Sequence, residues 1–200
     1  ILAESTMTGG EFNGPYVWYH PNGEISTRME IKAGNQDGKY MQSYPDGRLM
    51  VKGSFENGDK TGLWITYYET GEVESEEKYF QNMKDSVHTD YYKDGKIRLR
   101  ETYFADELDG ESFMYGTDGS LMVKLIYAED EITGYQYSKG GSLTEMIPIT
   151  EGDQTIEAYY ENGNKSFEQH FIDYVPDGPQ IKFYPDGKLM QRREYKNGLL

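Results

Sequence analysis

The stretch GKYMQSYPDGRLMVKGSFENGDKT, residues 38–61, decides the fold of this chain. Two runs that suit a pleated, half-buried surface, 40–44 and 49–55, flank a Pro-Asp-Gly loop at 45–47, and an Asn-Gly pair follows at 57–58. Asp-Gly or Asn-Gly between two such runs is the strongest short-range signal for a β-hairpin, because a type I′ turn needs positive φ at both central residues. The stretch therefore predicts one hairpin, whose Asn-Gly loop leads into the next.

The same pattern recurs along most of the chain, usually every 24 residues. The turn glycines are Gly23, Gly47, Gly71, Gly95, Gly119, Gly141, Gly163 and Gly187. Eight repeats begin near residues 14, 38, 62, 86, 110, 134, 154 and 178, with Ser86 and Gln154 in places where the other repeats start with glycine. Residues 1–13 do not match and predict an N-terminal cap or tail. We therefore expect an all-β protein, an elongated array of about eight β-hairpins forming one twisted antiparallel sheet over a single domain, 14–200.

A two-residue turn at Asp46-Gly47 would place Pro45 opposite Arg48 and Tyr44 opposite Leu49, and this register assigns each side chain to a face. One face is predicted to form the core. At the far end of the hairpins it carries Ile31, Phe55, Tyr79, Tyr103, Tyr127, Ile149, Phe171 and Tyr195. Nearer the turns it carries Tyr44, Tyr68, Tyr92, Tyr160 and Tyr184, which lie opposite Leu49, Val73, Ile97, Lys165 and Leu189. The other face carries aromatic residues on first arms and the charged residues Arg28, Lys52, Glu76, Arg100, Lys124, Glu168 and Arg192 on second arms.

The sixth repeat is shorter than the others, with each arm reduced by two residues. Side chains alternate with period two, so an even deletion shortens a strand without inverting its faces. Pro148 lies in this repeat and cannot donate to a ladder, which favours an edge or a bulge. We expect the array to kink or narrow near residues 134–153.

Composition restricts the partners of the chain. It has no cysteine, and 20 basic against 35 acidic residues give a net charge of −15, which disfavours nucleic acid and anionic lipid and favours a basic protein partner. No apolar run approaches the roughly 18 residues of a membrane-spanning helix. The chain begins at Ile1, which suggests removal of a leader and favours export to the periplasm or cell surface of a bacterium.

Two repeats carry a resemblance to a known family. The third repeat has Gly62, Trp64, Tyr67, Tyr68, Thr70-Gly71, Val73 and Tyr79, and the last has Gly178, Phe183, Tyr184, Asp186-Gly187, Leu189, Tyr195 and Asn197-Gly198. These residues resemble the unit of the MORN-repeat-variant proteins of bacteria, over about residues 14–200. The resemblance implies a MORN-like sheet that serves as a binding scaffold without shared catalytic residues. Some members of that family are described as antitoxin components of toxin–antitoxin pairs, and others as exported proteins.

The sequence offers little for catalysis or cofactor binding. His20, His88 and His170 fall in repeats one, four and seven, about 30 Å apart in a linear array, so they cannot share a metal or form a dyad. The acidic loops 106–109 and 129–131 lack an EF-hand spacing, and solvated loop acids are the simpler explanation. We therefore expect no enzyme, no catalytic residue, no metal site and no cofactor.

Tyrosines in the first arms are the candidate ligand-binding residues. They are Tyr19, Tyr67, Tyr91, Tyr115 and Tyr159, and consecutive repeats would stack such rings at a rise of roughly 10 Å. Rigid aromatic side chains with a hydroxyl suit an extended peptide, a protein face or a glycan. The alternative is that the rings form a second half-buried layer.

The leading hypothesis is a non-enzymatic scaffold that binds another protein along an acidic, tyrosine-rich surface. If the resemblance extends to function, it implies antitoxin-like neutralisation of a basic partner by occlusion, weakened by salt. The alternative is an exported carbohydrate or cell-wall binding protein that uses the tyrosines as a stacking platform.

Overall fold

A computed structural model describes residues 3–199, and every regular element in that range is a β-strand. The chain divides into two compact units. We call residues Ile1–Gly95 with Phe104–Asp106 the N-terminal unit, and Lys96–Tyr103 with Glu107–Leu200 the C-terminal unit.

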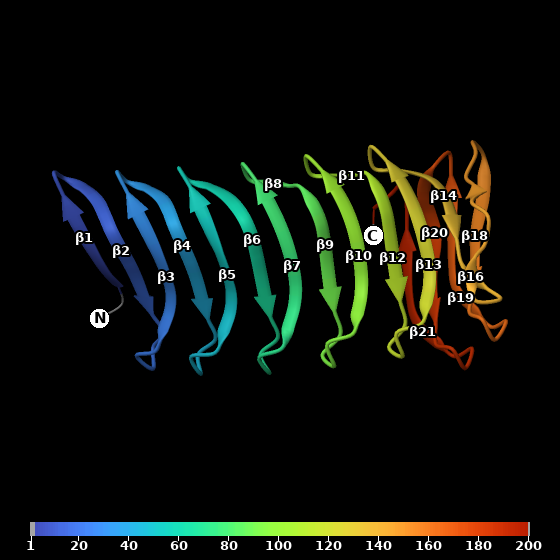
Figure 1. Cartoon of the computed structure of the whole chain (residues 1–200), viewed down its shortest axis with the longest axis horizontal. Coiled ribbons are helices and arrows are strands. Elements are labelled where there is room, and N and C mark those ends of the chain that lie inside the picture. The colour runs from blue at the N-terminus through green and yellow to red at the C-terminus, as the bar shows by residue number, and fades with distance from the viewer. Residues whose placement is uncertain (1–2, 200) are drawn as a thin grey trace. The chain divides into compact units, whose positions relative to one another are not determined.

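The N-terminal unit is an antiparallel sheet in which consecutive strands are neighbours. Its order is β1-β2-β3-β4-β5-β6-β7-β9, with the short β8 paired to β7 (Figure 1). The strands are β1 (Ala3–Thr8), β2 (Glu11–Tyr19), β3 (Ile25–Lys32), β4 (Asn35–Ser43), β5 (Leu49–Glu56), β6 (Asp59–Tyr67), β7 (Val73–Phe80), β8 (Met83–Lys84) and β9 (Ser86–Tyr91). Residues 3–8, expected as a cap or tail, form the first strand, which pairs with β2.

The C-terminal unit contains shorter strands and more than one sheet. Its strands are β10 (Ile97–Phe104), β11 (Glu107–Leu108), β12 (Gly110–Tyr115), β13 (Leu121–Ala128), β14 (Glu131–Gln136), β15 (Ser138–Lys139), β16 (Ser142–Leu143), β17 (Ile147–Pro148), β18 (Asp153–Tyr159), β19 (Lys165–Ile172), β20 (Val175–Phe183) and β21 (Leu189–Tyr195). Strands β10-β12-β13-β14-β17 are neighbours in one sheet, β15 pairs with β16, and β18 to β21 form a four-stranded sheet.

The expected all-β array of antiparallel hairpins is confirmed, but the expectation of a single sheet needs correction. Within the C-terminal unit the ladder ends at β17, and the four strands after it form a sheet of their own. The break falls at the shortened sixth repeat, where a kink was predicted. Its strands β15, β16 and β17 have two residues each, too few to extend the ladder, and Pro148 in β17 has no N–H to donate.

The predicted two-residue turn at Asp46-Gly47 is wrong. Tyr44 N donates to the carbonyl of Arg48 at 2.8 Å and Gly47 N to that of Tyr44 at 2.9 Å, so the loop has three residues, and Tyr44 lies opposite Arg48. In residues 45–47 only Gly47 has a positive φ, 84°. This is a type I turn with glycine in the left-handed position, for which Pro45 has the right φ.

Beyond the loop, however, the predicted pairing returns. Ser43 pairs with Leu49, and a bulge follows, so that Gln42 pairs with Val51 and Gly38 with Phe55. These outer pairs are those that a two-residue turn would have given. The assignment of faces therefore survives the error in the turn.

The type I′ geometry occurs instead at the loops between repeats, and also at the two-residue turn Gly140-Gly141 of the sixth hairpin. Both central residues have positive φ at Ala33-Gly34, Asn57-Gly58, Gln81-Asn82, Ala105-Asp106, Glu129-Asp130, Asp173-Tyr174 and Asn197-Gly198. Each of these loops also bonds to the one before it. Asp130 N, for example, donates to the Leu108 carbonyl at 2.9 Å, and Leu108 N donates to Asp130 Oδ1 at 2.7 Å.

The two faces of the N-terminal sheet differ in chemistry. One, here called the ladder face, carries Tyr16, Tyr40, Phe55, Trp64 and Tyr79. The other, here called the tyrosine face, carries Tyr67, Tyr91 and a row of cross-strand neighbours. That row is Val17, Arg28, Met41, Lys52, Ile65, Glu76 and Thr89.

The C-terminal unit holds the main hydrophobic core, between its two larger sheets. Val123 and Leu125 of β13 join Ile156 of β18 and Phe167 and Phe171 of β19 in one buried cluster. The hydroxyl of buried Ser166 donates across this core to the carbonyl of Met122. In this unit, strands β18 and β19, which follow the sixth repeat, cover the face of β13 that carries Val123 and Leu125.

The predicted core face is partly correct. Its far-end column supplies Ile149 and Phe171 to the buried cluster, with Tyr127 packed against it. Near the hairpin turns the prediction fails for Leu189, which is 59% exposed, and for Ile97 and Tyr184, which are also exposed. At Leu189 the three-residue loop and its bulge carry the start of the second arm away from the core.

Candidate functional site

The candidate tyrosines all occupy the last position of a first-arm strand. Tyr19 ends β2, Tyr67 ends β6, Tyr91 ends β9, Tyr115 ends β12 and Tyr159 ends β18, and each is half-buried. The repeat period thus puts them in equivalent places, as the sequence predicted. Their role as ligand contacts stays a prediction.

In the N-terminal unit, these tyrosines contact charged residues of the neighbouring second arm. Lys52 Nζ lies 5.4 Å from the centroid of the Tyr67 ring, a cation–π geometry. The Tyr91 phenol donates to Glu76 Oε2 at 2.9 Å. The aromatic and charged columns predicted for this face therefore lie side by side and restrain each other.

In the C-terminal unit, the rings have aromatic neighbours. Tyr115 stacks on Phe113 with centroids 6.4 Å apart and an interplanar angle of 14°. Tyr159 meets Tyr137 edge to face at 5.6 Å, and its phenol donates to Glu157 Oε2 at 2.9 Å. Burial raises the pKa of Tyr115, and the Glu157 carboxylate does the same for the pKa of Tyr159.

Sequence reasoning missed an aromatic ladder on the opposite face of the N-terminal sheet. The Trp64 ring lies 5.4 Å from Tyr40, 5.1 Å from Phe55 and 6.2 Å from Tyr79. Trp64 is 6% exposed, and Lys60 Nζ lies 4.5 Å from its ring centroid. The signal was present in the 24-residue recurrence of Tyr16, Tyr40 and Trp64. Buried packing makes this ladder structural.

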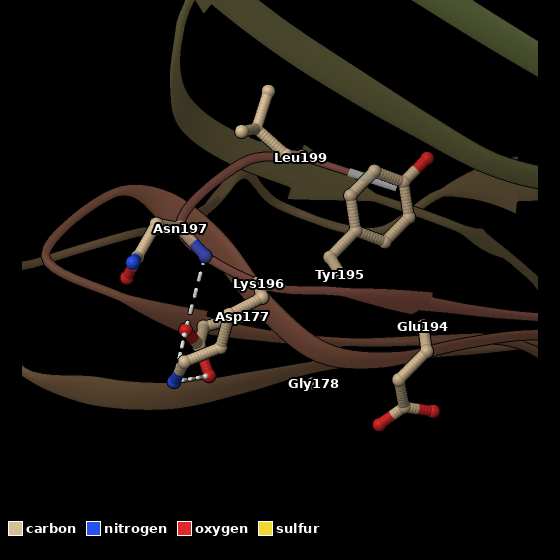
Figure 2. Close-up of a pocket in the computed structure, with 7 residues that line it drawn as sticks. All are labelled: Asp177, Gly178, Glu194, Tyr195, Lys196, Asn197 and Leu199. Atoms are coloured by element: carbon tan, nitrogen blue, oxygen red, sulfur yellow. Dashed lines mark hydrogen bonds and ion pairs between the residues drawn. The ribbon is translucent and has the colours of Figure 1, made fainter.

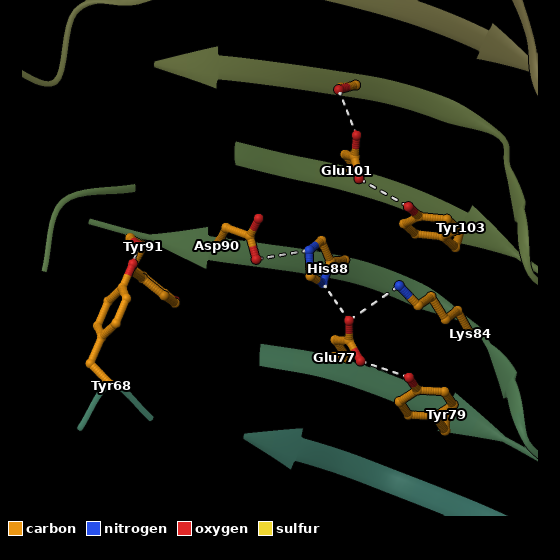
Figure 3. Close-up of polar contacts among 10 residues, drawn as sticks. Tyr68, Glu77, Tyr79, Lys84, His88, Asp90, Tyr91, Glu101 and Tyr103 are labelled. Atoms are coloured by element: carbon orange, nitrogen blue, oxygen red, sulfur yellow. Dashed lines mark hydrogen bonds and ion pairs between the residues drawn. The ribbon is translucent and has the colours of Figure 1, made fainter. Parts of the chain in front are cut away.

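A polar cluster continues the ladder face at β7 and β9. His88 is 8% exposed, with Nδ1 3.3 Å from Glu77 Oε1 and Nε2 3.0 Å from Asp90 Oδ1 (Figure 3). Glu77 also receives the Lys84 ammonium at 3.1 Å and the Tyr79 phenol at 2.6 Å. The cluster is a network of ion pairs and hydrogen bonds in which a carboxylate lies on each side of the imidazole.

The electrostatics of this cluster follow from burial and pairing. Burial alone would raise the pKa of Glu77, but hydrogen bonds from Tyr79 and Lys84 outweigh it and lower that pKa. Burial first, and then the Glu77 carboxylate, raise the pKa of Tyr79. Glu77 is therefore ionised and Tyr79 neutral near pH 7.

The C-terminal unit repeats this motif in reduced form. Tyr103 donates to Glu101 Oε2 at 3.0 Å (Figure 3). The buried Ser112 hydroxyl donates to Glu101 Oε1 at 3.5 Å. Ser112 takes the place that His88 holds one repeat earlier. Lys182 is also partly buried here, and that burial, helped by the nearby Arg193, lowers its pKa to about 8.

The other two histidines make separate local contacts. His20 Nε2 lies 2.8 Å from the Ser43 carbonyl. His170 lies between the Asp177 carbonyl and Asp153 Oδ1, the latter at 2.7 Å, and these two hydrogen bonds raise its pKa.

The acidic loops serve the fold through their side chains. Asp106 Oδ1 accepts Lys84 N at 2.6 Å, and Asp130 Oδ1 accepts Leu108 N. In residues 3–199, no group of three or more His, Cys, Asp or Glu side chains is arranged to hold a metal ion.

A cavity of about 490 Å³ lies beside the last strand, β21. Tyr195 and Leu199 form its apolar side, and Lys196 pairs there with Asp177, with Nζ 3.0 Å from Oδ2 (Figure 2). Asp177 Oδ2 also accepts Asn197 N at 3.2 Å. These contacts fix the loop that follows β21, so we interpret the cavity as a packing irregularity beside that loop.

Comparison with known proteins adds a family resemblance at three places. Residues 12–33, 60–82 and 176–197 match the family described as MORN repeat variant. Each match covers one hairpin, β2–β3, β6–β7 or β20–β21, with its three-residue loop at the centre. MORN repeats are in general binding or scaffolding units without enzymatic activity. No curated protein matches the chain. No helix in the described residues is long and apolar enough to cross a membrane.

Proposed function

We propose that this chain is a non-enzymatic scaffold that binds another protein along the tyrosine face. The sheet offers a flat, regular surface on which equivalent side chains recur at each hairpin. An active-site groove would need functional groups that converge on a substrate from several directions. In the described clusters, by contrast, the titratable side chains pair with one another. The proposal rests on the composition of the tyrosine face.

One observation carries this proposal: exposed apolar side chains lie among charged ones around Tyr67. Met41 and Leu63 are 38% and 53% exposed, and their cross-strand partners are Lys52 and Lys78. Aromatic residues and methionine within a polar surround are typical of the interfaces of non-obligate complexes. Tyr67 is already held by Lys52, so it would lose little side-chain entropy on binding.

The net charge of the whole chain, rather than the Lys52 and Lys78 side chains beside Met41 and Leu63, supports a basic partner. With 35 acidic and 20 basic residues, the chain attracts a positively charged protein at long range and raises its association rate at low salt. The finer part of the proposal is that the partner is a basic toxin, neutralised because the sheet covers its active surface. This part comes from the resemblance to MORN-repeat-variant proteins.

Affinity capture from a lysate of the source organism, followed by reconstitution with the purified captured protein, tests the proposal. Binding should weaken at least tenfold in the Tyr67/Tyr91→Ser variant and fall as salt rises. Tyr184→Ser, which changes a partly exposed tyrosine outside the column, is the matched control and should bind as the parent does. A reconstituted complex that tolerates both the double variant and high salt would refute the proposal.

A further inference from the structure

Two adjoining cavities lie beside the shortened sixth repeat, inside the C-terminal unit. One, of about 300 Å³, is lined on one side by Tyr137 and Tyr159, and the other, of about 350 Å³, by Leu121 and Pro185. Both include Ser138, Tyr160 and Glu161 in their lining. We call the two together the Glu161 cleft. The volume of each cavity lies within the range of roughly 300–1,000 Å³ that is ordinary for ligand pockets.

The cleft has a physical origin in the short hairpin. Strands β15 and β16 have two residues each, whereas the first arm of the next repeat, β18, has seven. The hairpin is held down at its turn, because Glu161 accepts Gly140 N at 2.8 Å, Gly141 N at 3.1 Å and the Ser138 hydroxyl. Because the arms are short and the turn is anchored, the half-buried Tyr159 lines the cavity beside them.

We propose that the Glu161 cleft binds a neutral saccharide. The apolar side of the cleft suits the C–H face of a sugar ring. Tyr137 and Tyr159 meet at 62° with centroids 5.6 Å apart, and the hydrogen bond from Tyr159 to Glu157 fixes one of the rings. Preformed aromatic walls bind at low entropic cost.

The polar side of the cleft calls for a ligand that donates hydrogen bonds. Hydrogen bonds from Ser138 and from Gly141 N lower the pKa of Glu161, so the carboxylate is ionised at neutral pH. Asp118 Oδ1 lies in the same lining and accepts Ser120 N at 3.0 Å. Ionised carboxylates only accept hydrogen bonds, and each offers about four acceptor positions. Sugar hydroxyls supply donors, whereas a phosphate or carboxylate ligand would face two carboxylates, Glu161 and Asp118, against the single ammonium of Lys139 in the lining.

This inference goes beyond the protein scaffold proposed above and uses other residues. The protein-binding test changes Tyr67 and Tyr91, neither of which lines either cavity. Failure of one proposal therefore leaves the other standing. A basic peptide is the competing occupant, because two carboxylates would also attract a cation.

Isothermal titration calorimetry of the whole chain tests the cleft against maltotriose, cellotriose, xylotriose, mannotriose and triacetylchitotriose, with spermidine and an oligolysine peptide as cationic probes. We expect millimolar binding of at least one neutral trisaccharide and weaker binding of the cations. Tyr137→Ala should weaken saccharide binding about tenfold or more, Tyr137→Phe should keep it within about threefold, and Tyr67→Ala should leave it unchanged. Near-ultraviolet circular dichroism confirms that each variant is folded.

Three results would overturn the proposal. They are binding of none of the five trisaccharides at 10-millimolar order, binding that Tyr137→Ala leaves intact in a folded protein, and Tyr137-dependent binding of the cationic probes alone. The last result would assign the cleft to a basic peptide.

Discussion

The phenol of Tyr44 donates to the backbone carbonyl of Tyr67 at 2.9 Å, so that one hairpin holds the next by a bond spanning 23 positions. The same bond recurs from Tyr68 to Tyr91 at 2.6 Å and from Tyr160 to Phe183 at 2.8 Å. In the first repeat His20 takes the place of the tyrosine and contacts the Ser43 carbonyl. These tyrosines were predicted as core residues, and hydrogen bonding between repeats explains why tyrosine rather than phenylalanine occurs there.

Removing one of these hydroxyls should destabilise the fold in proportion to its burial. Tyr160 is 4% exposed, so Tyr160→Phe leaves a carbonyl without its partner and should lower the free energy of unfolding by about 1–3 kcal/mol. Urea denaturation measures the change. Tyr184→Phe is the control, since the Tyr184 phenol forms no hydrogen bond within residues 3–199, and it should change stability by less than about 0.5 kcal/mol. Equal losses in both variants would contradict this account.

Gly53 should tolerate no side chain. A Cβ atom there would lie 2.2 Å from Cδ2 of Trp64, whose ring the neighbouring aromatic residues fix. Gly53→Ala should therefore lower the free energy of unfolding by about 1–3 kcal/mol through overpacking. Ser54→Ala, on the opposite face of the same strand, serves as the matched control. A Gly53→Ala protein as stable as the parent would show that the ladder face can rearrange.

Ser86 should be more stable as glycine. It begins the fourth repeat with a φ of 88°, and the corresponding Gly38 has 120° and Gly110 111°. A non-glycine residue in this region is strained, so Ser86→Gly should raise the free energy of unfolding by about 0.5–1 kcal/mol. Ser75→Gly, in an ordinary strand conformation, should lower it. Thermal and urea unfolding of both variants decide the sign.

Stability should depend on pH through His170. Hydrogen bonds to the Asp177 carbonyl and to Asp153 raise its pKa above the usual value of 6.5. The charged imidazole therefore adds stability that is fully present below about pH 6.5 and is lost as the pH rises through the higher pKa of the folded state. Unfolding measured between pH 5 and 9 should show this loss in the parent. His170→Gln and Asp153→Asn should both flatten it, and an unchanged slope in either would contradict the assignment.

Much of the fold follows from the sequence because alternation and turn chemistry act locally. Short-range rules predict the Asp-Gly and Asn-Gly loops and the 24-residue period. They also predict which face of the sheet carries Phe55 and which carries Tyr67. The turn error at Asp46-Gly47 was avoidable, since Pro45 favours the first central position of a type I turn. The Glu161 cleft was not foreseeable, because the short sixth hairpin indicates an irregularity but not what surrounds it.

The packing of the C-terminal unit was harder to predict because it depends on contacts between distant strands. Phe167 and Ile156 occupy positions where the third repeat has Ser75 and Trp64. Each of these residue differences is isolated in the sequence, and the alternation of side chains between the two faces of the sheet continues through it. The bulky Phe167 shows its significance only when β13 lies across it.

The backbone hydrogen bonds between successive loops of the N-terminal unit run in one direction along the chain. Asn82 N donates to the carbonyl of Lys60 at 3.0 Å and Asp106 N to that of Lys84 at 2.9 Å, so each loop rests on the loop synthesised before it. As the chain leaves the ribosome, every new hairpin of the N-terminal unit meets a strand edge that is already formed. This unit can therefore fold vectorially, one hairpin at a time, without waiting for the C-terminus of the chain.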